Sequence, residues 1–74
     1  MNLYIIEGVL NDYTSGMVVI AAENINRCRE LFMSEFESGD LLAELDEAIL
    51  FGNYKVLSVN NHPEGIVSYM HGGG

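Results

Sequence analysis

Two consecutive amphipathic segments between Glu23 and Glu47 constrain the fold of this chain most strongly. When successive residues are placed about 100° apart, the apolar side chains of each segment fall within one arc, as in a helix that buries one stripe. In the first segment these are Ile25, Cys28, Leu31, Phe32 and Phe36, and in the second they are Leu41, Leu42, Leu45, Ala48 and Ile49. The pattern predicts two helices, each with one buried and one solvent-facing side.

Polar residues predict where these helices begin and end. Asn24 is expected to cap the first helix, because its side-chain oxygen can accept a hydrogen bond from a free N–H group of the first turn. Ser38-Gly39 is expected to separate the helices, with glycine taking the left-handed conformation of a helix end and Asp40 capping the second helix. We expect that helix to end near Ile49 or Leu50.

The flanking sequence predicts four strands, two before the helices and two after them. These segments are rich in β-branched and aromatic residues and are separated by Asn, Asp, Pro and Gly in the predicted loops Asn11–Gly16, which includes Tyr13, and Asn61–Gly65. The order ββααββ, read as two hairpins, predicts an α+β fold: a four-stranded, mainly antiparallel sheet with one or two helices packed on one face. The predicted strands are Leu3–Leu10, Met17–Ala22, Tyr54–Asn60 and Ile66–Met70. We expect a single compact domain over residues 1–71 and a flexible glycine tail over residues 72–74.

The first two strands carry apolar residues on both alternating faces, most clearly in Met17–Ala22 and Tyr4–Ile6. A sheet covered by helices on one side usually shows polar residues on the other. Either a bent sheet shields this second face with loops and tyrosine rings, or the face binds a second copy of the chain or another partner.

Composition narrows the functional classes. The 74 residues include one cysteine, which excludes an internal disulfide, and no apolar run approaches the roughly 18 residues of a membrane span. The start of the chain lacks the basic region of a signal peptide, so we expect a cytoplasmic protein with no membrane partner. Three basic residues against a net charge of −8 argue against direct nucleic-acid binding.

No catalytic or metal-binding signature is present. Cys28, His62 and His71 do not have the spacing of metal ligands, and the serines lack a nucleophile-elbow context. We therefore expect no metal, no cofactor and no enzymatic activity. A small enzyme or ligand-binding module that uses His62 and His71 is a further possibility, as is a purely environmental adaptation of the acidity to high salt.

The acidity itself is concentrated in the predicted helices. Seven carboxylates lie between Glu30 and Glu47 with no Lys or Arg between them. Asp46 and Glu47 fall near the negative end of a helix dipole, and the repulsion between neighbouring acids is unfavourable, so local stability does not explain the placement. A field of one sign attracts a basic partner. The candidate partner-binding residues are Glu30, Glu37, Asp40, Glu44, Asp46 and Glu47.

In size, charge and clustered helical acids, the chain resembles the small acidic phage-encoded anti-CRISPR proteins that mimic nucleic acid. The resemblance implies a host-cell cytoplasmic inhibitor that binds the basic nucleic-acid-binding surface of a CRISPR-type defence complex and blocks DNA or RNA binding. The alternative is a small homodimeric structural or adaptor protein that acts through its apolar sheet face. Solubility alone also accounts for an acidic surface of this size.

Overall fold

The structure, a computed structural model, describes residues 1–11 and 14–73. Asp12 and Tyr13 of the predicted first loop, and Gly74 of the predicted tail, lie outside the described residues. The predicted order and fold class are confirmed: the chain is an α+β protein with four antiparallel strands and two helices. The elements are β1 (Asn2–Val9), β2 (Gly16–Ala22), α1 (Ile25–Phe36), α2 (Gly39–Leu50), β3 (Tyr54–Ser58) and β4 (Gly65–Met70).

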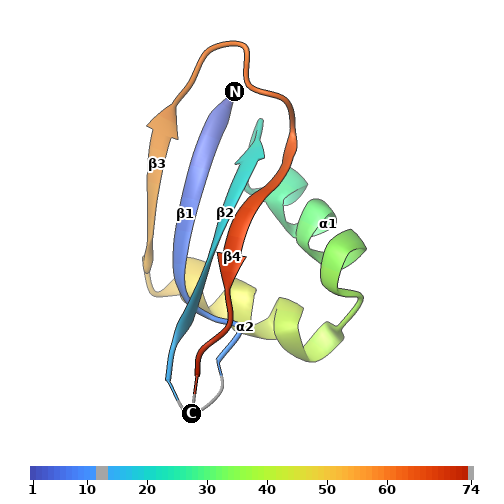
Figure 1. Cartoon of the computed structure of the whole chain (residues 1–74), viewed down its shortest axis with the longest axis vertical. Helices are drawn as coiled ribbons and strands as arrows, with labels where there is room; N and C mark the ends of the chain where they lie inside the picture. Colours follow the sequence, from blue (N-terminus) through green and yellow to red (C-terminus); the bar gives the residue numbers. More distant parts are fainter. Residues whose placement is uncertain (12–13, 74) are drawn as a thin grey trace.

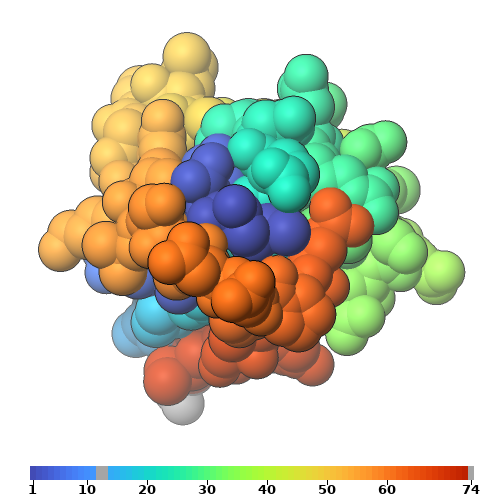
Figure 2. All heavy atoms as spheres, turned by 90° about the horizontal axis from the view of Figure 1, so that it is seen from above, coloured from blue at the N-terminus to red at the C-terminus, as the bar shows by residue number. Residues whose placement is uncertain are grey.

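The sheet has the order β3-β1-β2-β4, and both helices lie on one of its faces (Figure 1). The predicted second hairpin is wrong, because β3 and β4 form opposite edges of the sheet: β3 pairs with β1 and β4 pairs with β2. The six residues 59–64 connect them across the end of the sheet, over the N-terminus (Figures 1 and 2). Six extended residues span up to about 20 Å, and three strand spacings measure only about 14 Å, so the connection is long enough.

The helix ends follow from side-chain capping. Asn24 caps α1 as predicted, since its side-chain oxygen accepts a hydrogen bond from the Arg27 amide at 2.9 Å. The cap of α2 is Ser38, whose hydroxyl accepts from the Leu41 amide at 3.2 Å, and Asp40 lies in the first turn instead. The left-handed residue between the helices is Glu37 rather than a glycine. Within the described residues, neither helix is long and apolar enough to cross a membrane.

The core lies between the sheet and the helices. Alternate residues of the two central strands point toward the helices and are almost completely buried, as the period of a strand requires. The helices contribute Cys28 and Phe32 from α1 and Leu45 and Ala48 from α2. The strand residues of this cluster are Tyr4, Ile6, Val9, Val18, Ile20 and Ala22.

The chain beyond β4 packs against the loop of the first hairpin. The amide of buried Gly72 donates to the carbonyl oxygen of Leu10 at 2.9 Å. The hydroxyl of Thr14 donates to the carbonyl oxygen of Gly73, and the Gly73 amide donates back to that hydroxyl, both at 2.9 Å. These contacts hold residues 72 and 73 on the hairpin, and the flexibility of this tail stays a prediction.

Candidate partner-binding surfaces

An ion pair joins the two helices. Arg29 of α1 donates from Nε and from a terminal nitrogen to the two carboxylate oxygens of Asp46 on α2, at 2.6 and 3.1 Å. This hydrogen bonding raises the pKa of Arg29 above its ordinary value. The pair gives Asp46 a structural reason for its position near the end of α2. The interpretation that local stability does not explain this acid is therefore wrong for Asp46.

The second arginine forms a bridge between α1 and the β3–β4 connection. Arg27 donates to Glu64 at 2.7 Å and, more weakly, to Glu30 at 3.4 Å. The hydrogen bond from Arg27 holds the pKa of the Glu64 carboxyl below its usual range, against a smaller opposing effect of desolvation. Glu30, a predicted partner-binding residue, is thus partly neutralised by its own helix.

Glu44 is less accessible than the sequence suggested. The residue is half-buried, and its Oε1 atom is shielded from solvent with no hydrogen-bond partner among the described residues. It lines a hollow of about 130 Å³ near the first hairpin, together with Asn11, Glu47 and Asn53. Glu44 therefore faces the protein more than it faces a partner.

The other predicted acids are exposed. Glu37, Asp40 and Glu47 are open to solvent and form no ion pair within the described residues. Glu35 is also exposed, but it lines the groove between α1 and β4. The six candidates do not form one cluster: Glu30 and Glu37 line a groove with Arg29, whereas Glu44 and Glu47 line the hollow near the hairpin. The described residues contain no group of three or more His, Cys, Asp or Glu suited to a metal ion.

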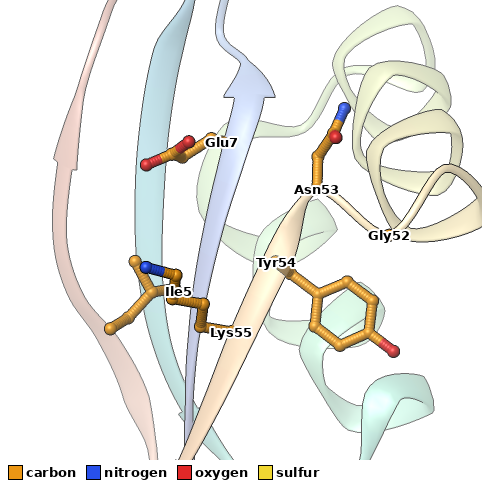
Figure 3. A pocket seen from close by; sticks show the side chains of 6 residues that line it. All are labelled: Ile5, Glu7, Gly52, Asn53, Tyr54 and Lys55. Atoms are coloured by element: carbon orange, nitrogen blue, oxygen red, sulfur yellow. The ribbon is translucent and has the colours of Figure 1, made fainter.

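No described element covers the second face of the sheet, which is largely apolar. Residues that pair across neighbouring strands point to the same face of the sheet. Leu3, Ile5 and Met17, together with their partners on the neighbouring strands, form this second face. Leu57 and Met70 on it are 52% and 65% exposed. Figure 3 shows Ile5, Glu7 and Lys55 on this side and Tyr54 on the other, around a hollow of about 220 Å³ at the β3 edge. The apolar members are Leu3, Ile5, Met17, Val19, Ala21, Leu57 and Met70.

Cys28, His62 and His71, which the sequence analysis considered for chemistry, have different surroundings in the structure. Cys28 is completely buried, and burial raises the pKa of its thiol to about 11, so the reactive thiolate is suppressed. Nδ1 of His62 lies 2.7 Å from the carbonyl oxygen of Pro63. The ring of His71 packs edge-on against Tyr69, with centroids 5.6 Å apart, and Tyr69 in turn packs against Phe36.

Sequence reasoning missed one exposed apolar region at the end of α2 and along β3. Leu50 and Phe51 are 79% and 69% exposed, and Val56 and Leu57 of β3 are also exposed. The sequence did indicate part of this exposure, because Leu50 and Phe51 fall outside the apolar arc of the second helix.

The comparisons with known proteins add no assignment. No protein-family model matches the chain, no curated protein matches its sequence, and no solved structure matches it.

Proposed function

We propose that this protein is a non-catalytic binding protein whose acidic helical layer docks on a basic, nucleic-acid-binding surface of another protein. The observation that carries the proposal is the imbalance of charge on this layer. From α1 through α2, seven carboxylates face only two guanidinium groups, and both arginines form ion pairs within the fold. The layer therefore presents exposed acids, and its two arginines, although partly exposed, are already paired with carboxylates of the described residues.

The acids that carry the binding in this proposal differ from the original six. Glu37, Asp40 and Glu47 are exposed and unpaired in the described part of the chain, so they contribute most. Asp46 and Glu30 contribute less because arginines already neutralise them. The proposed mechanism is competition, in which carboxylates occupy the lysine and arginine sites that otherwise hold phosphates.

The narrower proposal is that the partner is a CRISPR-type defence complex. It rests on the resemblance in size, charge and acid placement. One capture experiment tests both the general and the narrower proposal. A tagged protein is incubated with a purified RNA-guided complex at about 50 and about 500 mM salt, because exposed charge contacts weaken over this range. Unlabelled DNA serves as the competitor. We expect capture at low salt and displacement by DNA.

A matched pair of variants localises the contact. Asp40→Lys/Glu47→Lys and Glu7→Lys/Glu23→Lys change the net charge by the same amount, but only the first pair lies on the helical layer. The proposal expects the first variant to lose capture and the second to keep it. Equal loss in both would mean that net charge alone attracts the partner. Full capture by a folded Asp40→Lys/Glu47→Lys variant contradicts the proposal.

The uncovered apolar sheet face favours a second candidate function, that of a small adaptor or self-associating protein. Its support is the exposure of Leu57 and Met70 beside the half-buried side chains of Ile5 and Val19. Association through such a face persists or strengthens in high salt, whereas binding through the acids weakens. An Ile5→Lys substitution would remove partner capture by this face and leave capture by the helical layer unchanged.

A further inference from the structure

The two edge strands of the sheet, β3 and β4, differ in how readily each can pair with a further strand. β3 pairs with β1 in unbroken register from Asn2–Ser58 to Ile6–Tyr54. The pairing of β4 with β2 is interrupted by a register shift between Val19 and Ile20. Bulges of this kind twist an edge and protect it from further pairing, whereas a regular edge strand is a template for another strand.

Exposed apolar side chains lie at both edges, and at the β3 edge they extend onto the end of α2. Four of the eight large hydrophobic residues that are exposed in the described chain lie at the end of α2 and on β3, and three lie on β4. The end of α2 and β3 lie together on one side of the molecule, coloured gold and orange in Figure 2. The four residues are Leu50, Phe51, Val56 and Leu57.

Charge distinguishes the two edges as well. The sixteen residues from Ala48 to Pro63 contain no Asp or Glu, and this is the longest stretch without an acid in a chain with a net charge of −8. Lys55 lies in its middle. Each edge has one acid beside it, Glu7 at the β3 hollow and Glu35 at the groove beside β4, but only β3 carries a lysine, which lies in the same hollow as Glu7. The positive charge of Lys55 reduces the repulsion between two copies of this acidic protein at β3.

We propose that β3 pairs with β3 of a second copy of this chain, antiparallel and centred on Val56. Val56 is the middle residue of the five-residue strand, so a two-fold axis through it places Val56 against its own copy. Lys55 then lies opposite Leu57 of the second copy, where its aliphatic stem covers the leucine and its ammonium group reaches water. The alternative register that pairs Lys55 with itself is disfavoured by repulsion of like charges.

The area at this edge suits a weak dimer. The exposed parts of the four hydrophobic residues amount to roughly 400 Å² per chain, taking side-chain areas of about 150–200 Å². Because Val56 and Leu57 point to opposite faces of the sheet, the two copies, with their paired strand backbones, bury at most about 1,000–1,200 Å², the lower end for specific interfaces. We expect a dimer that dissociates on dilution. The inference is independent of the proposed function of the helical layer, because it uses different residues.

The test is the mass of the full chain in solution, by sedimentation equilibrium from about 10 μM to about 1 mM, the range in which small interfaces dissociate. We expect the wild type to approach twice its chain mass of 8.2 kDa at the high end. The matched substitutions are Val56→Lys on β3 and Val67→Lys on β4, at residues 45% and 47% exposed. Val56→Lys is expected to weaken dimerisation at least tenfold, and Val67→Lys to leave it unchanged.

Three results would overturn the inference. One is a wild type that stays monomeric at about 1 mM, a concentration at which weak interfaces of this size associate. Another is a dimer that Val67→Lys disrupts and Val56→Lys does not. The third is a dimer lost in Ile5→Lys but retained in Val56→Lys, which would place the contact on the sheet face. If Val56→Lys does not fold, amide exchange of the wild type decides: β3 amides must gain protection with concentration.

Discussion

Arg29 on α1 and Asp46 on α2 form a two-pronged ion pair, with the guanidinium group 2.6 and 3.1 Å from the two carboxylate oxygens. Asp46 therefore serves the packing of one helix on the other. The pair divides the acidic residues into those that stabilise the fold and those that remain available to a partner. Asp40 and Glu47 belong to the second group.

Asp46→Asn should lower the thermal midpoint slightly at low salt, because the amide loses the charge that attracts Arg29. The difference from wild type should shrink at high salt, since both side chains are more than 40% exposed and their attraction is screened. Glu47→Gln is the control: it removes an exposed acid near the negative end of α2 and should keep or raise the midpoint. Calorimetry at two salt concentrations measures both. A larger loss in Glu47→Gln would contradict this division of roles.

Gly16 is expected to tolerate no side chain. A Cβ at this position would lie 2.6 Å from the Val9 carbonyl oxygen and 2.9 Å from the Gly72 nitrogen, and it would overlap the carbonyl oxygen of Met70. Overpacking of this kind typically costs about 1–3 kcal/mol, so Gly16→Ala should lower the free energy of unfolding by at least that amount. Urea denaturation measures it.

Gly39 provides the matched control for that substitution. It lies at the start of α2, and a Cβ there meets nothing within 4 Å. Gly39→Ala should therefore raise the free energy of unfolding by about 0.5–1 kcal/mol, because alanine restricts the unfolded chain and favours the helix. Equal effects of the two substitutions would show that the close contacts around Gly16 do not matter.

The sequence predicted the elements well because their signals are local. The apolar period of the helices, the capping oxygen of Asn24 and the β-branched runs all act within a few residues. The cap of α2 was predicted two residues too late, since Ser38 and Asp40 carry equally suitable oxygens and only the path of the chain selects between them.

What the sequence did not predict depends on contacts between distant segments. β3 and β4 lie on opposite edges because each pairs with a different free edge of the β1–β2 hairpin. No local sequence pattern indicates which edge a later strand will join. The ion pairs of Arg29 with Asp46 and of Arg27 with Glu64 join residues 17 and 37 positions apart. These pairs changed the candidate site most, because they removed Asp46 from the available acids and weakened Glu30.

Cys28 should be unreactive in the folded protein. Its side chain is completely buried, and burial raises its pKa to about 11, so little thiolate exists at pH 8. A thiol reagent should modify it only as fast as the protein unfolds. The control is Ser34→Cys on an exposed position of the same helix, which should react at once. Rapid modification of Cys28 in the wild type, without loss of structure, would contradict its burial.

Cys28→Ser should lower the free energy of unfolding by about 1–3 kcal/mol, because it places a polar hydroxyl among the apolar side chains of the core.

The Arg27–Glu64 pair should make stability depend on pH in acid. The hydrogen bond from Arg27 lowers the pKa of Glu64 in the folded state, so the pair contributes stability above the unfolded-state pKa, about 4.3, and that contribution is lost as pH falls through the folded-state pKa. Glu64→Gln should therefore be less stable than wild type at pH 7, and the two should converge in strong acid. In an Arg27→Met background, Glu64→Gln should have no effect at either pH, because its partner is absent. Unfolding of the four proteins in urea at several pH values measures this coupling. An unchanged gap between Glu64→Gln and wild type down to strong acid would mean that the carboxylate charge of Glu64 does not stabilise the fold through Arg27.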